Sequence, residues 1–292
     1  MPRVALATYD PRPEPSKDRD LPGLRAALEE AGAEADAVFW DDDIDWASYD
    51  LVVIRSTWDY SWRAAEFTAW AERCGKLTRL ANPASVVRWN TDKRYLGELA
   101  AAGVPTVPTR FLAPGDADAA AGLPGDHEYV VKPTSGAGAR YAARYTPDRR
   151  EAAVRHLARM HAEGLTAMVQ PYMRSIDTGG ERALQFFGGS LLHASRKRAV
   201  LAPGTAFDAD KVAHPGLEPW TPTPAELTVA ERALAALPDA PELLYARVDL
   251  VDGDDGEPRV MELELVEPNL FLFLHPESVP AVVAAILAAA TP

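Results

Sequence analysis

Two glutamates that stand one residue apart, Glu262 and Glu264, raise the first chemical question in this sequence. Read as a strand, the stretch 260–269 places both carboxylates on one face and Leu263 and Leu265 on the other. Like charges so placed repel each other, and a sheet gains no stability from them. The spacing therefore predicts a positive partner between the two carboxylates or a proton on one of them.

A lysine followed by a run of small residues forms a second candidate site in the stretch 129–141. An apolar strand carries Lys132, and the glycines after it would let backbone N–H groups converge on a phosphate while the lysine supplies a compact charge. Neither GxxxxGK[ST] nor GxGxxG fits, because the lysine precedes the glycines and Tyr141 stands where the third glycine would be. A plain hairpin turn would explain the glycines and leave Lys132 unexplained.

Lys93 and Arg94 are cations at an unfavourable place. The pattern predicts a helix that begins at Asn90 and runs to Ala102, with both cations in its first turn. The helix dipole disfavours positive charge there by roughly a few tenths of a kcal/mol. A bound anion would reverse that sign. Anion binding and an ordinary surface lysine are both open at this point.

Two arginines form a further candidate group. Arg182 lies on the expected strand 181–187, and Arg196 stands at the end of the expected strand 190–195. A hairpin turn at Gly188-Gly189 joins the two strands. The chain has a net charge of −13, so a local cluster of cations is not expected from randomly distributed solvated charge. These arginines are therefore predicted to lead toward the acidic stretch.

The elements that must position these side chains begin with alternating strands and helices over residues 1–80. The third expected strand shows no alternation of apolar and polar residues, as is typical of parallel strands buried on both faces. This part of the chain is predicted to be a small βαβ domain with a parallel sheet. The expected strands are 4–7, 35–40 and 51–54, and the expected helices are 24–31, ended by Gly32, and 66–74, ended by Gly75.

The loops after the first and third strands are predicted to bind substrate. In open α/β sheets ligands bind beyond the carboxyl ends of the strands, and both loops carry polar and aromatic residues there. The plainer alternative is that Asp59 or Ser61 caps the next helix while Trp58 packs in the core. The candidate substrate-binding residues are Tyr9, Asp10, Arg55, Ser56, Thr57, Trp58 and Asp59.

Composition limits the class of protein. The chain has 292 residues, 47% of them hydrophobic and 25% charged, which predicts about two domains of an ordinary globular protein. The net charge of −13 argues against a nucleic-acid surface but leaves a local pocket for a small anion open. The only cysteine is Cys74, so no internal disulfide can form, and a reducing cytoplasm fits. We expect no signal peptide, because the N-terminus has no long apolar stretch and turns polar at once. We also expect no membrane partner, because the longest apolar stretch, 279–290, is shorter than the ~20 residues of a membrane span.

The order of these features resembles the ATP-grasp ligases over nearly the whole chain. Two lysines, a small-residue loop, basic strands and a final Asp and Glu-x-Glu set follow one another at plausible spacing. The stretches 90–93 and 262–268 carry most of the likeness. The chain is most similar to the glutathione-synthetase-like branch and, within it, to the O-ureido-serine cyclo-ligases that close the D-cycloserine ring, a likeness to which the loop 55–60 contributes.

The resemblance implies an α/β and α+β architecture, in which an ATP-grasp fold follows a small parallel-sheet βαβ domain. The implied domains are residues 1–85 for the N-terminal domain, 86–168 for the central lid subdomain and 169–292 for the C-terminal subdomain with the metal site.

The resemblance also implies the ATP site. Both lysines would contact phosphates, the loop 135–140 would close over them, and the backbone of the hinge 170–173 would meet adenine. Many relatives place an acid two residues before the catalytic arginine, whereas here Glu181 is adjacent to Arg182, so the residue that binds ribose is left open. The implied ATP-binding residues are Lys93, Lys132, Ser135, Gly136, Gln170, Pro171, Tyr172, Met173 and Glu181.

The implied metal ligands are Asp249, Glu262 and Glu264. They would hold Mg²⁺, as two ions, with Mn²⁺ able to substitute. Mg²⁺ takes hard oxygen ligands from a few carboxylates, phosphate oxygens and water. Many relatives have Asn where this chain has Glu264, which makes the expected site more negative. A solvated acidic edge is the plainer alternative for the glutamates.

The implied reaction joins a carboxylate to a nitrogen through an acyl phosphate, on a small amino-acid derivative and inside one molecule in a cyclo-ligase of antibiotic biosynthesis. Arg182 and Arg196 would act as catalytic residues by stabilising developing negative charge. In the substrate loops, Arg55 or Lys17 would hold an acidic end, Asp59 or Asp10 an amino group, and Trp58 would exclude water. The alternatives are an intermolecular ligase that makes a dipeptide or tailors a peptide, and a nucleotide-binding regulator without turnover. A homo-oligomer is left open.

Overall fold

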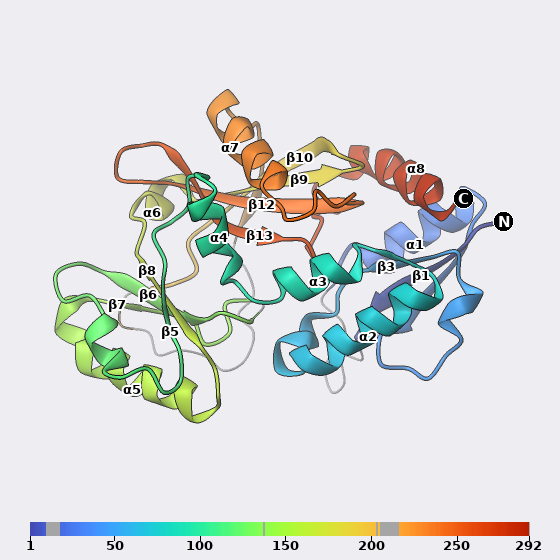
Figure 1. The fold of residues 1–292 in the computed structure, drawn as a ribbon. Helices are drawn as coiled ribbons and strands as arrows, with labels where there is room; N and C mark the ends of the chain where they lie inside the picture. The colour runs from blue at the N-terminus through green and yellow to red at the C-terminus, as the bar shows by residue number, and fades with distance from the viewer. Residues whose placement is uncertain (10–17, 137, 203, 205–215, 292) are drawn as a thin grey trace.

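Three sheets make up the molecule. The computed structural model describes residues 1–9, 18–136, 138–202, 204 and 216–291, so the predicted substrate residues Asp10 and Lys17 lie outside the described residues. In Figure 1 the blue N-terminal sheet lies at the right, the green sheet at the lower left, and the yellow-to-orange sheet at the top. None of the helices among the described residues is long and apolar enough to cross a membrane.

The N-terminal sheet has the strand order β2-β1-β3-β4, and its strands run parallel. The predicted parallel sheet is thus confirmed. Its third strand is buried at every position, in agreement with its unbroken apolar sequence. The elements are β1 (Arg3–Thr8), α1 (Leu21–Glu30), β2 (Glu34–Phe39), η1 (Trp46–Ser48), β3 (Leu51–Ile54), η2 (Trp58–Trp62), α2 (Ala64–Leu77) and β4 (Arg79–Ala81).

The helix α2 continues past Gly75, so its predicted end was wrong. Phe67, Trp70 and Cys74 of this helix are buried in one apolar cluster with Trp40. This packing outweighs the low helix propensity of glycine.

The helix expected to begin at Asn90 begins at Tyr95, and a separate helix precedes it. Asn90 ends the first of them instead of starting the second, because its side chain is used in a tertiary contact. Its Nδ2 donates to the carbonyl of Leu263 at 3.1 Å, and its Oδ1 accepts from the N–H of Leu265 at 2.8 Å. Lys93 therefore lies in the connection between the helices. They are α3 (Ala84–Asn90) and α4 (Tyr95–Ala101).

The second sheet is antiparallel, with the order β5-β8-β6-β7. The helix α5 covers one of its faces, where Tyr129, Leu157 and Met160 share an apolar cluster. The expected domain boundary after residue 168 falls inside β8, and we propose to place it after that strand. The elements are β5 (Arg110–Leu112), η3 (Ala119–Gly122), β6 (Tyr129–Pro133), β7 (Ala143–Tyr145), η4 (Pro147–Arg149), α5 (Arg150–Ala162) and β8 (Ala167–Pro171).

The third sheet has the order β11-β10-β9-β12-β13, and its strands run antiparallel. One face packs on α4 and α7 through residues such as Leu184, Val248 and Leu263. Gly188 and Gly189, both with positive φ, form the predicted hairpin turn. The elements are α6 (Ser175–Gly179), β9 (Glu181–Phe187), β10 (Ser190–Lys197), β11 (Leu217–Trp220), α7 (Pro224–Ala235), β12 (Tyr245–Asp252), β13 (Pro258–Glu264), η5 (Pro276–Ser278) and α8 (Val279–Ala290).

Candidate active site

A cavity is lined by residues from all three sheet regions. Trp58 and Tyr60 reach it from η2, Lys93 from the connection before α4, and Lys132 from β6. The third sheet packs one face on α7, and its other face contributes the acidic residues Asp249, Glu262 and Glu264 to the cavity. The fold therefore brings together groups that are far apart in the sequence.

Strand register gathers the charges of the third sheet on the cavity side. Asp249 on β12 is paired with Glu262 on β13, and Arg247 is paired with Glu264. Side chains two residues apart in a strand share a face, and these four line the cavity. The face expected for Glu262 and Glu264 is thus confirmed.

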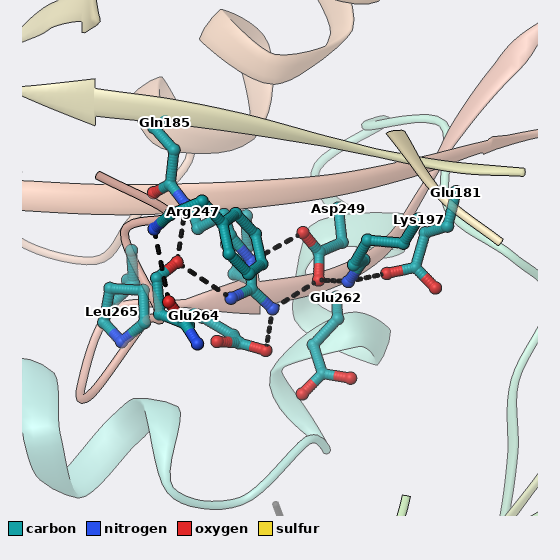
Figure 2. A network of polar contacts seen from close by, with 12 residues as sticks. Glu181, Gln185, Lys197, Arg247, Asp249, Glu262, Glu264 and Leu265 are labelled. Atoms are coloured by element: carbon teal, nitrogen blue, oxygen red, sulfur yellow. Dashed lines mark hydrogen bonds and ion pairs between the residues drawn. The ribbon is translucent and has the colours of Figure 1, made fainter. Parts of the chain in front are cut away.

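Arg247 and Lys197 hold Asp249 between them, as Figure 2 shows. Nε and Nη2 of Arg247 each donate to a carboxylate oxygen of Asp249 at 2.8 Å. Nζ of Lys197 donates to Asp249 at 2.7 Å and also forms an ion pair with Glu181. A second ion pair joins Arg247 to Glu264. The positive partner predicted for Glu264 is therefore a side chain of the protein.

Glu262 has its own cations. Nζ of Lys93 lies 3.2 Å from one of its oxygens, and Nζ of Lys132 lies 3.9 Å from the other. Lys93 also donates to the carbonyl of Gly136 at 2.6 Å, in the small-residue loop. The structure thus brings together the two predicted phosphate lysines and the loop.

Four acids that line the cavity ionise at different pH values. Burial raises the pKa of Glu264 to about 7, and burial followed by the charge of Glu264 raises that of Glu267 to about 8. For Asp249 burial acts in the same direction, but Arg247 and Lys197 hold its pKa well below the usual range. For Glu262, burial is likewise outweighed by Lys93 and Lys132, which lower its pKa. Asp249 and Glu262 are therefore ionised at a lower pH than Glu264 and Glu267.

Of the three carboxylates expected to bind magnesium, only two have oxygens available for a metal ion. Among the described residues, no group of three or more His, Cys, Asp or Glu side chains is arranged to hold a metal. Both oxygens of Asp249 already accept hydrogen bonds from Arg247 or Lys197. The side chains of Glu262 and Glu264 are 22% and 25% exposed and line the cavity. These two glutamates could contribute oxygens beside phosphate oxygens, whereas Asp249 would first have to leave its partners.

The predicted hinge lines the same cavity. Gln170, Pro171, Tyr172 and Met173 all contribute, together with the apolar side chain of Met261. A partly apolar wall suits a flat heterocycle such as adenine.

Ser135 lies elsewhere. It borders a separate hollow beside α2, while Gly136 of the same loop lines the cavity. The next described turn of this loop carries Arg140, which donates to the carbonyl of Ser61 at 3.2 Å. The loop thereby contacts η2 of the N-terminal region.

Of the predicted substrate residues that the structure describes, Trp58 lines the cavity. Tyr9 packs beside it, with ring centroids 6.2 Å apart. Asp59 accepts a hydrogen bond from Nε1 of Trp40 at 2.9 Å and pairs with Arg63, which gives it a structural setting outside the cavity lining.

Arg55, Ser56 and Thr57 stand behind the cavity wall. All three are buried, and none of them lines the cavity. Nη1 of Arg55 donates to the carbonyl of Pro268 at 3.2 Å, and Oγ of Ser56 lies 2.8 Å from Oγ1 of Thr8. Arg55 therefore supports the segment after β13 and has no direct access to the cavity.

The expected position of the two arginines assigned to catalysis needs correction. Arg182 and Arg196 are paired across β9 and β10 and point to the face away from the cavity. Arg182 donates to Glu226 at 2.6 Å and pairs with Asp252. Arg196 pairs with Glu218 at 2.6 Å. Their catalytic role stays a prediction, one that this geometry does not favour.

Several cavity residues were missed from the sequence. Arg247 stands two residues before Asp249, so period two in one strand could have placed both on one face. Lys197 stands one residue after Arg196, so the same rule puts it on the opposite face from that arginine. Glu267 and Tyr60 also line the cavity, but no local pattern distinguishes them.

Comparisons with known proteins identify the family of this chain. The family described as the N-terminal domain of D-cycloserine synthetase DcsG matches residues 4–82. The cycloserine biosynthesis protein DcsG of Streptomyces lavendulae is 43% identical over 278 residues, which cover 87% of this chain and 88% of that protein. The crystal structure of D-cycloserine synthetase DcsG matches with a TM-score of 0.89 and 38% identity, over 99% of this chain and 100% of that one.

A more distant relative shares the fold alone. The D-alanine–D-alanine ligase of Bacillus anthracis matches with a TM-score of 0.70 and 17% identity, over 99% of this chain and 97% of that one. The ATP-grasp fold expected from the sequence is thus confirmed. The chain belongs to the DcsG family of D-cycloserine synthetases and is an ATP-dependent carboxylate–nitrogen ligase.

Proposed function

We propose that this enzyme closes the five-membered ring of cycloserine within one molecule of O-ureido-serine. The observation that carries the proposal is 43% identity to a cycloserine biosynthesis protein over 87% of the chain. Support comes from the cavity, in which cationic groups for phosphates lie beside an acidic face. The lone cysteine, Cys74, and the dependence on ATP fit work in the cytoplasm.

In this proposal ATP lies with its adenine against the hinge 170–173. Its phosphates lie against Lys93 and Lys132, which carry the positive charge near Glu262. Glu262 and Glu264 would hold magnesium, which when bound offsets phosphate charge. The protein's own part in this step is to align the substrate carboxylate with the γ-phosphorus.

Arg247 and Lys197 are proposed to stabilise charge as the reaction proceeds. A carboxylate oxygen attacks the γ-phosphorus and ADP leaves; a substrate nitrogen then attacks the acyl carbon and phosphate leaves. Both steps develop negative charge on oxygen, which preorganised cations stabilise in a buried site. Trp58 and Tyr60 would keep water from the acyl phosphate.

The test is a turnover assay with one substrate at a time. Purified protein with ATP and Mg²⁺ is given each enantiomer of O-ureido-serine, and phosphate release and product mass are measured. We expect phosphate release in step with a ring-closed product from a single substrate. Release only with pairs of amino acids, with a dipeptide mass, would favour an intermolecular ligase, and ATP binding without any turnover would favour a regulator.

A further inference from the structure

Glu267 is a buried acid that the reaction described above does not use. It is 6% exposed and lines the cavity near Tyr60, which is 4% exposed and lines it too. The two groups interact electrostatically, since burial and then the charge of Glu267 raise the pKa of the Tyr60 hydroxyl.

The backbone around Glu267 is held firmly. Val266 before it is 1% exposed, and the carbonyl of Pro268 after it accepts the hydrogen bond from Arg55 at 3.2 Å. The carbonyl of Asn269 accepts a further hydrogen bond from Gln185 at 2.7 Å. The position of Glu267 is therefore determined by its supports on both sides, as preorganised binding groups require.

The Glu267 carboxylate has no charged partner within ion-pair distance among the described residues, in contrast to Asp249, Glu262 and Glu264. Nor does any hydrogen bond join it to another described residue, and only its own backbone N–H contributes. The Tyr60 hydroxyl likewise has no hydrogen-bond partner in the part of the chain that the structure describes. A buried carboxylate without a partner is costly unless something else satisfies it.

We propose that Glu267, assisted by the hydroxyl of Tyr60, binds the α-ammonium group of the amino-acid substrate. The inference rests on the proposed function, because it takes an amino-acid derivative as the substrate. The substrate carboxylate must lie toward the phosphate lysines, and the ammonium group is attached one carbon away from it. Glu267 shares the cavity with these lysines, and the charge of Lys93 already favours its ionised form against burial. A bound ammonium group would act in the same direction as Lys93, so Glu267 would bind it as a carboxylate.

This contact decides which nitrogen reacts. A neutral α-amine could attack the acyl phosphate of a second molecule and give a dipeptide, whereas an ammonium group has no lone pair to attack with. The ureido nitrogen then forms the C–N bond as the bond from carbon to the phosphate oxygen breaks. The phosphate leaves with the bonding electron pair, and the proton of the nitrogen passes to the released phosphate. The ring nitrogen, the one bonded to the side-chain oxygen, still carries the carbamoyl group of the ureido function. Water then removes this group as carbamate, which is released as CO₂ and ammonia.

The test compares the parent enzyme with Glu267→Gln on two compounds. One is O-ureido-serine and the other is the same molecule with hydrogen in place of the α-amino group. We expect the variant to raise KM for the amino compound by about 10- to 150-fold, because one hydrogen bond between charged groups is lost. KM for the desamino compound should stay nearly unchanged, because that compound does not make this contact. ATP affinity should also stay unchanged. Glu226→Gln is the control, because Glu226 is 4% exposed but lies on the far face with Arg182 and should keep the preference for the amino compound.

Equal loss on both compounds, or a lower melting temperature alone, would overturn the inference. If the parent enzyme forms no ring, the proposed function has failed, and calorimetric binding of the two compounds in the presence of ADP tests Glu267 independently. Preference of the parent for the amino compound, lost in Glu267→Gln, would then uphold the inference. No preference in the parent would overturn it.

Discussion

Two buried arginines on opposite faces of one sheet show how similar surroundings can serve different purposes. Arg247 is 3% exposed and Arg182 is 2% exposed. Each pairs with two carboxylates, Arg247 with Asp249 and Glu264 and Arg182 with Glu226 and Asp252. Burial, charge and the number of partners therefore do not distinguish them.

The difference lies in what their partners face. Arg247, Asp249 and Glu264 all line the cavity, while Arg182 and its partners do not. The carboxylate of Glu226 also accepts hydrogen bonds from the backbone of Thr223 at 2.7 Å and from Nε1 of Trp220 at 3.2 Å. The partners of Arg182 are thus bound by other protein groups away from the cavity, whereas the partners of Arg247 can contact a ligand in the cavity.

The strongest test of this contrast replaces each arginine by lysine, which keeps the charge but loses the planar fork of donors. Arg247→Lys should lower kcat by about 10²–10³-fold, because preorganised charge at the reacting oxygen is lost. Arg182→Lys should lower the melting temperature and leave kcat per folded molecule nearly unchanged. Turnover and thermal unfolding are measured on the same samples. Lost turnover in Arg182→Lys at an unchanged melting temperature would instead support its original assignment to catalysis.

The failure to separate these arginines from sequence has a physical cause. Alternation along one strand tells which residues share a face but not which face looks into a cavity. That choice depends on α7, which starts more than forty residues after Arg182 and covers the other face of the sheet. By contrast, the alternation of Glu262 and Glu264, the buried β3 and the hairpin turn at Gly188-Gly189 follow from local rules, and the structure agrees with them.

Other misses were also decided by contacts distant in sequence. The sequence pattern predicts a helix start at Asn90, but the side chain of Asn90 forms hydrogen bonds with the backbone of Leu263 and Leu265. Glu267 lies outside any strand, so no periodicity points to it. The order of the motifs was enough to identify the fold. Which residues line the site depends on strand pairing and on which face of the sheet the helices cover.

The second prediction extends the contrast to the lysines of the cavity. Burial lowers the pKa of Lys132, because it disfavours the charged ammonium group. A bound phosphate would stabilise this charge and offset the effect of burial. Lys132→Met should therefore weaken ATP binding by about 10- to 150-fold, since a charge-assisted hydrogen bond is lost, and should not lower the melting temperature. Calorimetry with ATP measures the affinity. Unchanged ATP affinity would remove Lys132 from the phosphate site.

The third prediction separates two neighbours, Trp58 and Asp59. Trp58 lines the cavity, so Trp58→Ala should raise substrate KM by roughly tenfold, with ATP affinity preserved. Asp59 is bound to Trp40 and Arg63, so Asp59→Asn should lower the melting temperature by a few degrees with KM unchanged. Substrate kinetics and thermal unfolding of both variants provide the measurement. A reversed pattern would place the substrate on the Asp59 side of the loop.

The smallest expected effect concerns the pH dependence of stability through Glu267. Its pKa is raised from 4.5 to about 8, first by burial and then by Glu264, with Glu262 acting in the same direction and Lys93 against it. The folded protein thus holds this proton more tightly than the unfolded chain does. The resulting contribution to stability is complete below about pH 4.5 and is lost as the pH rises toward 8.

Glu267→Gln cannot titrate, so its melting temperature relative to the parent should rise by about 2–4 °C between pH 5 and pH 8 in the absence of substrate. The comparison with Glu226→Gln sharpens the contrast between the two faces of the sheet. Burial raises the pKa of Glu226, but the backbone N–H of Thr223 and the side chains of Trp220 and Arg182 together lower it. The loss of the Glu226 charge should therefore cost stability at pH 8 and less at pH 4. The melting temperature relative to the parent should rise with pH for Glu267→Gln and fall with pH for Glu226→Gln. Opposite trends would support a Glu267 carboxylate that lacks a partner in the protein and a Glu226 carboxylate that has one. Parallel trends would mean that Glu267 has a partner within the protein and is not available to bind a cation.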